Sequence, residues 1–261
     1  MRTLFKSIKM AIVVLMFSGT AVFADLSDIL KSGTVKIAVP EAFAPFGSVG
    51  ASEEHEGYDV DVAKLIAKDL GVKLELVPVV SKQRIPFLET NRVDLVISTM
   101  GANPKRAKSI NFSSAYAPFY SGVFAASSIE IFDSEDLDGL TIGVTGGTLE
   151  DLELTESAPK GAKITRFGDN AATLSAFTSG QVKVLVAGNT AAASLSAANP
   201  DLDIERKYII KESPCFIGVK KGNEDLLRWV NVFILHKKLG GDLNDISLKW
   251  LGQDLPPLPT L

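Results

Sequence analysis

The sequence predicts an α/β fold made of two units of similar size. Runs rich in β-branched residues alternate with helical patterns, first over residues 35–98 and again over residues 141–198. This alternation is typical of α/β units with a mostly parallel sheet. Two extended stretches, 116–126 and 213–219, follow the first and the second unit. We therefore expect the chain to cross into a second lobe and to return to the first.

The apolar pattern places the elements of the first unit in order. We expect strands at 35–39, 74–80 and 94–98, separated by helices near 59–70 and 85–90. Each expected strand is short and β-branched, and each helix repeats apolar residues at helical spacing. The first unit therefore reads as three strands joined by helical crossovers.

The second unit repeats this order, and a helical region ends the chain. The expected strands are 141–145, 163–167 and 182–187, and the expected helices are 148–154, 171–179 and 190–198. Residues 223–251 read as two helices interrupted at Gly240 and Gly241, with apolar residues on one face of the first helix. We expect this helix pair to pack back on the first unit.

The first 24 residues have the pattern of a secretory signal peptide. Arg2, Lys6 and Lys9 precede an apolar run at 10–17, and small residues at 21–24 suit a cleavage site. The run is too short to span a bilayer, so we expect cleavage and export to the periplasm, with retention as an uncleaved anchor as the alternative. Loss of the three cations would take the formal net charge from −4 to −7, which argues against nucleic-acid binding.

Composition gives few signs of catalytic or metal chemistry. The chain has 261 residues, 46% of them apolar, enough for one large core or two modest ones. Cys215 is the lone cysteine and is expected to be a small buried hydrophobe. The two histidines, His55 and His236, are far apart and lack neighbouring ligands at metal-binding spacing, so we expect no metal and no other cofactor.

The clearest functional signal is the segment DLVISTMGANPKRAKSINFS at 94–113. An apolar strand runs into a turn with Gly101 and Pro104, and the turn presents Arg106. Ligands commonly lie at such strand ends in α/β sheets. A permanently charged, planar guanidinium beside free backbone donors suits a carboxylate. Arg106 is therefore predicted to anchor a carboxylate ligand.

This segment resembles the carboxylate-anchoring loop of bacterial periplasmic amino-acid-binding proteins, the solute-binding protein family 3 of ABC transporters. Met100, Pro104, Arg106, Phe112 and Ser113 align with the family pattern without a gap. A second segment, GYDVDV at 57–62, is close to the family's signature sequence. Its two aspartates favour a helix start, and we prefer this structural role to acid/base or metal chemistry.

The resemblance covers nearly the whole mature chain and implies the fold. Members have the type II periplasmic-binding-protein fold, with two α/β lobes joined by two hinge strands. By this resemblance lobe 1 would comprise residues 25–119 and 214–261, and lobe 2 would comprise residues 120–213. The ligand would bind between the lobes.

Further site residues follow from the resemblance. Phe43, in PEAFAPF, would cover the apolar body of the ligand, with a core role as the alternative. GVTGGT at 143–148 runs from a strand into a helix start, where backbone amides favour an anion. Gly147 and Thr148 are therefore expected to meet the ligand's carboxylate when the lobes close; a plain tight turn is the alternative.

Arg84, in QRIP, is the second candidate anchor. Glutamate- and aspartate-binding members have an arginine here that faces the ligand's side-chain carboxylate, and a solvated arginine at a helix start is the alternative. Two guanidinium groups in one cleft would favour a dicarboxylate. The expected ligand-binding residues are Phe43, Arg84, Thr99, Gly101, Arg106, Gly147, Thr148, Gly188 and Asn189.

Some positions depart from the family pattern. Gly188 stands where an aspartate usually pairs with the ligand's α-ammonium, and its neighbour Asn189 supplies no negative charge. Gly101 replaces a usual Thr or Ser, and Lys183 stands where an acid is usual. On this basis Gly188→Asp is expected to strengthen the binding of α-amino acids.

The leading hypothesis is a periplasmic receptor, not an enzyme. It would act as a monomer that closes around a small carboxylated metabolite and delivers it to an inner-membrane ABC permease. An acidic amino acid is the first expectation, followed by a polar neutral amino acid or an acid without an α-amine. The alternatives are an enzyme similar to periplasmic cyclohexadienyl dehydratases, with Glu41 as general acid, and a ligand-sensing module.

Overall fold

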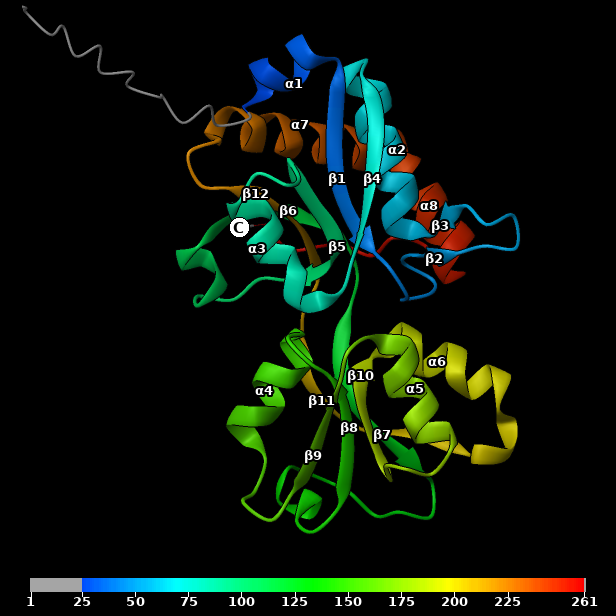
Figure 1. Ribbon diagram of the computed structural model, residues 1–261. Coiled ribbons are helices and arrows are strands. Elements are labelled where there is room, and N and C mark those ends of the chain that lie inside the picture. Colours follow the sequence, from blue (N-terminus) through cyan, green and yellow to red (C-terminus); the bar gives the residue numbers. More distant parts are fainter. Residues whose placement is uncertain (1–24, 261) are drawn as a thin grey trace, which may run out of the picture.

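The computed structural model describes residues 25–260, and these residues form two α/β lobes, one above the other in Figure 1. The signal peptide expected at residues 1–24 lies outside the described residues. No helix within 25–260 is long and apolar enough to cross a membrane. The two-lobed α/β fold expected from the sequence is confirmed.

Lobe 1, the upper lobe in Figure 1, is built on a five-stranded sheet. Its spatial order is β4 (Lys73–Val79), β1 (Thr34–Pro40), β5 (Leu95–Gly101), β12 (Cys215–Lys220) and β6 (Ile110–Ala117). β1 is parallel to β4 and β5, whereas β12 is antiparallel to β5 and β6. Because β12 inserts between two strands from the first half of the chain, the sheet is complete only after the chain has returned from lobe 2.

Helices cover both faces of this sheet. They are α1 (Leu26–Ser32), α2 (Tyr58–Leu70), α3 (Arg84–Glu89), α7 (Glu224–Gly240) and α8 (Asp242–Leu251). Alternate residues of β1 belong to different clusters: Ile37 packs with α2, α7 and α8, and Ala38 packs with Leu88 of α3. Side chains alternate across a strand, so α3 lies on the opposite face from α2, α7 and α8.

Glycines set the ends of these helices. Gly57 precedes α2 with a φ of 139°, and a Cβ there would lie 2.3 Å from the carbonyl oxygen of Phe46. Gly241, with a φ of 89°, ends α7 and precedes α8. Glycine is the residue that adopts such angles readily. The interruption expected at Gly240 and Gly241 is confirmed.

Lobe 2, the lower lobe in Figure 1, has a second five-stranded sheet. Its order is β11 (Ile204–Glu212), β7 (Tyr120–Ala126), β10 (Val184–Gly188), β8 (Thr141–Thr145) and β9 (Lys163–Phe167). Its helices are α4 (Leu149–Ser157), α5 (Asn170–Thr178) and α6 (Asn189–Ala198). Leu154 of α4 packs in one cluster, and residues of α5 and α6 pack in the other. α4 therefore covers one face and α5 and α6 the other.

Two short crossings join the lobes. β6 leads to β7 through residues 118–119, and β11 leads to β12 through residues 213–214. The backbone amide of Ser213 donates to the carbonyl of Phe119 (3.0 Å), which ties the crossings together. In each sheet the strand that has just crossed, β7 or β12, runs against its neighbours. The expectation of mostly parallel sheets holds for the remaining strands, and β11 and most of β6 were not anticipated.

Candidate functional site

Two arginines of lobe 1 face lobe 2 where the lobes meet. Arg84 begins α3, and Arg106 begins the short 3-10 helix Arg106–Lys108 that follows β5. Their relative exposures are 5% and 8%. They line one cavity of about 260 Å³ together with Ser81, Lys82, Ile85, Met100 and Gly147. The structure thus brings together the two cations that the sequence predicted to share a cleft.

Neutral groups fix the orientation of both guanidiniums. Arg84 Nε donates to Ser98 Oγ (3.0 Å). Arg106 Nη1 donates to the carbonyl of Gly101 (2.8 Å), and Nη2 donates across the cleft to the carbonyl of Gly147 in lobe 2 (3.0 Å). Neither arginine forms an ion pair with an acid of residues 25–260. Two oriented, buried cations without a counter-ion contact are chemically suited to an anion.

Burial also changes the acidity of these arginines. Loss of solvation, together with the nearby positive charge of Arg106, lowers the pKa of Arg84 to about 10. Loss of solvation lowers the pKa of Arg106 as well. Both groups stay protonated at neutral pH, so an anionic ligand would relieve the cost of burying them.

A buried hydrogen-bond network supports the lobe 1 side. Asp59, fully buried on α2, accepts from Tyr116 Oη (2.6 Å) and Thr99 Oγ1 (2.8 Å). Burial raises the pKa of Asp59 to about 6, against the effect of these donors and of Arg84. Thr99 has a φ of 46°, which is unusual for a β-branched residue. This geometry gives Asp59 a structural role, which the sequence analysis preferred to acid/base or metal chemistry. The hydroxyl of Thr99 belongs to the same network.

The lobe 2 turn uses its polar groups internally. Thr148 is the N-cap of α4: its hydroxyl donates to the carbonyl of Thr145 (2.8 Å) and accepts from the amide of Asp151 (3.2 Å). The amide of Gly147 donates to Asp151 Oδ2 (2.9 Å). The turn therefore faces lobe 1 with the Gly147 carbonyl, which accepts from Arg106. In this arrangement the Gly147 amide and the Thr148 hydroxyl are not free for a carboxylate, contrary to the expectation for an anion site.

An aromatic cluster closes the other side of the cleft. Phe43, 6% exposed, packs against Phe46 and Phe119, with ring centroids 5.5 and 6.2 Å away.

A Cβ at Gly188 would lie 2.0 Å from Cζ of Phe119. Asn189 Oδ1 accepts from the backbone amide of Tyr120 at the crossing (3.2 Å). The position expected to serve an amine is thus filled by an aromatic ring, so Gly188→Asp is no longer expected to strengthen binding.

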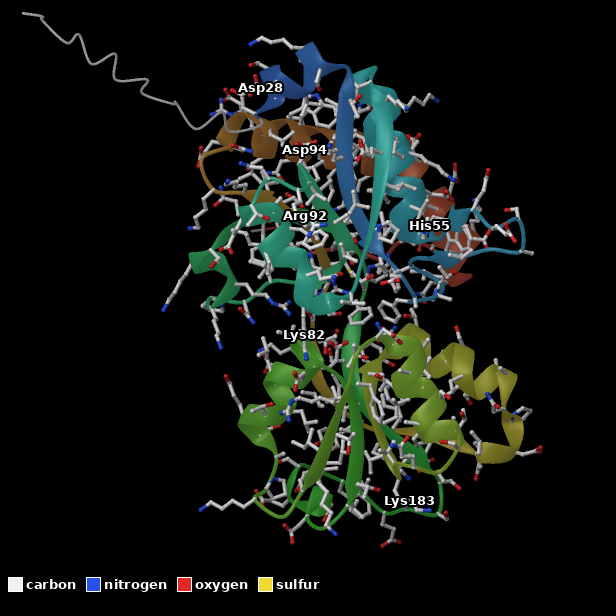
Figure 2. The ribbon with its side chains drawn as sticks, in the orientation of Figure 1. Asp28, His55, Lys82, Arg92, Asp94 and Lys183 are labelled. Carbon is white, nitrogen blue, oxygen red and sulfur yellow. The ribbon has the colours of Figure 1, made fainter. Side chains whose placement is uncertain are left out.

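Two further positions form close contacts between the lobes. A Cβ at Gly101 would lie 2.2 Å from Ser213 Oγ and 2.8 Å from Leu149 Cδ2 of lobe 2. Lys82 lies where the lobes meet in Figure 2, and its side chain passes over Gly147, leaving 2.7 Å between Lys82 Cγ and a Cβ placed there. Lys183 is at the far end of lobe 2, away from the cleft (Figure 2).

The sequence did not reveal every residue of the cleft. Glu150, the second residue of α4, is only 7% exposed and acts electrostatically on both Arg84 and Arg106. An acid in the first turn of a helix is ordinarily a solvated partner of the helix dipole, so its position gave no signal. Phe119 was missed because an aromatic residue in an extended segment is usually core.

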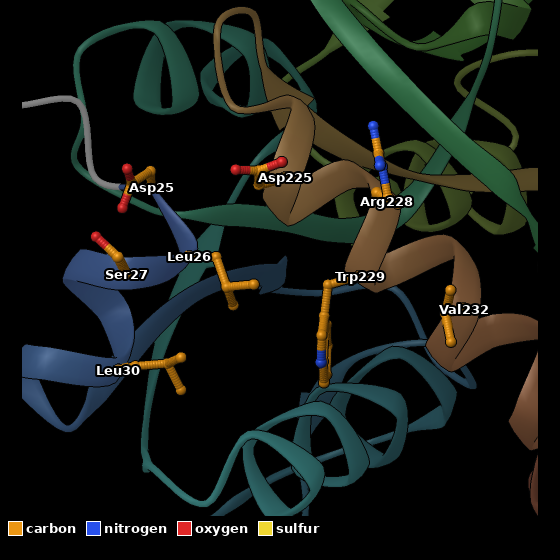
Figure 3. Close-up of a pocket in the computed structure, with 8 residues that line it drawn as sticks. All are labelled: Asp25, Leu26, Ser27, Leu30, Asp225, Arg228, Trp229 and Val232. Carbon is orange, nitrogen blue, oxygen red and sulfur yellow. The ribbon is translucent and has the colours of Figure 1, made fainter.

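A separate pocket of about 470 Å³ lies between α1 and α7, at the end of lobe 1 away from lobe 2 (Figures 1 and 3). Its apolar lining comes from Leu26, Leu30, Trp229 and Val232. Its one cation, Arg228, shares the pocket with Asp25 and Asp225. This pocket lacks the two buried guanidiniums of the cleft and is less suited to a carboxylate.

Comparisons with known proteins agree with this architecture. The family described as bacterial extracellular solute-binding proteins, family 3, matches residues 35–253. The glutamine-binding protein GlnH of an ABC transporter of Bacillus subtilis is 30% identical over 208 residues, 78% of this chain and 76% of the relative. The L-cystine-binding protein TcyJ of Escherichia coli K12 is 27% identical over 240 residues, 89% of each chain.

A solved structure shows the same fold. The solute receptor for L-cysteine of Neisseria gonorrhoeae superimposes with a TM-score of 0.82 at 31% identity, over 87% of this chain and 94% of that one. The match of sequence and structure extends over both lobes. The chain therefore belongs to the bacterial extracellular solute-binding proteins of family 3.

Proposed function

We propose that this protein is the periplasmic substrate-binding component of an amino-acid ABC transporter. It captures a small carboxylated solute, an acidic or polar amino acid, between its lobes. The observation behind this proposal is the pair of buried guanidiniums, Arg84 and Arg106, which have no ion pair within residues 25–260. The named relatives, which bind glutamine, cystine or cysteine, support an amino acid as the solute.

Binding is coupled to closure of the lobes. Arg106 belongs to lobe 1 and reaches the Gly147 carbonyl of lobe 2. A ligand that contacts both lobes favours the closed form, because a ligand shifts an equilibrium by its difference in affinity for the two states. The crossings at 118–119 and 213–214 are the proposed hinge, between lobe 1 (25–119 and 214–261) and lobe 2 (120–213).

The partners follow from this role. A monomer delivers the solute to an inner-membrane permease, and residues 1–24 direct its export. The relatives named above are binding proteins. The dehydratase alternative is not favoured, because Glu41, its candidate general acid, is an exposed side chain. General acids need a controlled environment in the cleft.

The test is a thermal-shift screen of refolded mature protein against amino acids, dicarboxylates, oxo acids and amines, followed by calorimetry of the ligands that bind. A ligand specific for the folded state raises the melting temperature. Arg106→Ala should weaken binding of the best ligand at least about 100-fold, because it leaves the ligand's carboxylate unpaired in the closed cleft.

Lys108→Ala is the matched control. Lys108 is an exposed cation of the same 3-10 helix, so its removal changes the net charge equally without touching the cleft. Equal affinity of wild type and Arg106→Ala would remove Arg106 as the anchor. A protein that bound amines but no carboxylate would contradict the proposed function.

A further inference from the structure

One face of α7 is apolar and exposed. Val232, Leu235 and Leu239 have relative exposures of 62%, 58% and 81%. Together with Arg228 they follow the alternating spacing of a coiled-coil seam, so the four side chains form one stripe along the helix, here called the α7 stripe. The buried residues of α7 lie on the opposite face and are Leu226, Val230, Phe233, Ile234 and Lys237. The α7 stripe therefore takes no part in the core of lobe 1.

An apolar groove flanks the first half of α7. It is the cavity of about 470 Å³ between α1 and α7, whose apolar lining is Leu26, Leu30, Trp229 and Val232 (Figure 3). Leu235 and Leu239, by contrast, belong to the second half of the helix. The helix thus has a groove beside its first half and an exposed apolar ridge on its second half.

The two ends of α7 carry opposite charges. Glu224 and Asp225 lie in the first turn, and Lys238 lies in the last turn. None of these three side chains forms an ion pair with another residue of 25–260. Lys237, the other cation of the last turn, is buried and already paired within lobe 1. A partner helix with the reverse order of charges would complement α7, and an antiparallel copy of α7 has that order.

We infer that the α7 stripe is a contact surface for a second copy of this chain, with the two α7 helices antiparallel about a two-fold axis near Val232. Leu235 and Leu239 of each copy then enter the groove beside the first half of the other copy's α7. Asp225 of each copy faces Lys238 of the other. A two-fold interface uses the same patch on both copies, so each of these contacts forms twice.

The opposite orientation does not offer these contacts. In a parallel pair the ridges would meet each other instead of the grooves, and like charges would face each other at both ends of α7. The charges and the shape of the helix therefore favour the same, antiparallel arrangement.

This inference goes beyond the proposed function and does not depend on it. The α7 stripe and its groove share no residue with the cavity between the lobes. Pairing through α7 therefore leaves the ligand cleft of each copy accessible. One helix and one groove from each copy make a small interface, so the pairing is reversible, and the monomer remains the form that meets the permease.

The first test is sedimentation velocity of the mature protein over about 1–500 μM, because association depends on concentration by mass action. The average mass should rise toward that of a dimer. Leu235→Glu should raise the Kd of the dimer at least about 30-fold, because it would bury a charge in an apolar groove. Thermal unfolding confirms that the variant is folded.

Val49→Glu is the matched control. Val49, in the short strand β2 (Ser48–Val49), is 56% exposed, close to the 58% of Leu235, and it lies outside the α7 stripe and its groove. The same change of an exposed aliphatic residue to an acid should leave the Kd of the dimer unchanged.

Charge reversal tests the antiparallel arrangement. Asp225→Lys alone and Lys238→Glu alone should each raise the Kd about tenfold, because each places like charges opposite one another. An equimolar mixture of the two variants should recover the wild-type Kd to within about threefold, because both ends of the mixed pair again join opposite charges. In a parallel pair, neither single variant would bind less tightly than wild type.

Three outcomes would overturn the inference. The first is a wild-type protein that stays monomeric at every concentration, and flotation of that monomer with vesicles of phosphatidylethanolamine and phosphatidylglycerol would assign the α7 stripe to a membrane instead. The second is a dimer that Leu235→Glu leaves intact, which would use another surface. The third is single charge variants that pair as tightly as wild type. Ligand capture is measured separately by calorimetry, so none of these outcomes decides the proposed function.

Discussion

The two walls of the cleft are built in different ways. The lobe 1 wall consists of charged side chains, Arg84 and Arg106, supported by the buried network of Asp59. The lobe 2 wall presents a backbone carbonyl at Gly147, a glycine at position 188 and one buried acid, Glu150. The lobe 1 wall is organised by hydrogen bonds within its own lobe, apart from the contact of Arg106 with the Gly147 carbonyl, whereas the lobe 2 wall becomes part of the site through closure.

This difference separates capture from selection. Groups fixed within one lobe can bind an anion before the lobes close, because their geometry does not depend on the other lobe. Groups on the second lobe act only on ligands that permit closure. Changes in lobe 1 should therefore affect stability and overall affinity, and changes at the contact with lobe 2 should affect closure and the choice of ligand.

The largest expected effect tests the internal support of lobe 1. The pKa of Asp59 is about 6 in the folded protein, against an ordinary value of 3.8. The folded state therefore keeps this proton to higher pH than the unfolded chain does, so its contribution to stability is full below pH 3.8 and is lost as the pH rises through about 6. At about 1.4 kcal/mol per pKa unit, the loss is about 3 kcal/mol.

This effect is measured by urea unfolding at pH values between 3.5 and 7, spaced by about half a pH unit. Wild type should lose that stability relative to Asp59→Asn, which remains neutral throughout. Parallel pH profiles for the two proteins would show that Asp59 titrates alike in the folded and unfolded states, and the idea of a strained, buried carboxyl under the cleft would be dropped.

A second prediction concerns Gly188 in the lobe 2 wall. Gly188→Asp should destabilise the protein by about 1–3 kcal/mol through overpacking and should weaken amino-acid binding about tenfold. The reason is the 2.0 Å separation between a Cβ at this position and Cζ of Phe119. Calorimetry and urea unfolding measure the two quantities.

Gly168→Asp is the control for this substitution. A Cβ at Gly168 meets no atom within 4 Å, so the same charge is added to lobe 2 without a clash. Tighter binding of α-amino acids by Gly188→Asp would instead restore the hypothesis from the sequence.

The smallest expected effect separates closure from capture. Gly101→Ala should weaken ligand binding about tenfold, or about 1.4 kcal/mol, because the added methyl group meets Leu149 Cδ2 of lobe 2 when the lobes are together. Small-angle scattering with saturating ligand should show a more open variant, and Gly168→Ala serves as the control. Unchanged affinity and shape would mean that Leu149 and Ser213 move aside at little cost.

Local pattern was sufficient for much of the fold. The expected strands 141–145 and 163–167 have the observed bounds, and the break at Gly241 was read from glycine alone. The segment around Arg106 was also readable, because a strand, a turn and an arginine are neighbours in sequence. β11 was missed, since its residues are half-buried or exposed and give no continuous apolar run.

The sequence by itself therefore determined the α/β order, the crossings and the candidate anchor Arg106, because these depend on residues close together in the chain. Only the tertiary structure decided which partners the polar groups of lobe 2 have and what surrounds Gly188. It committed the Gly147 amide and the Thr148 hydroxyl to their own turn, filled the place beside Gly188 with Phe119, and buried Glu150 in the first turn of α4. The interlobe contacts join residues distant in sequence, and they exist only because the chain crosses between the lobes twice and the lobes meet.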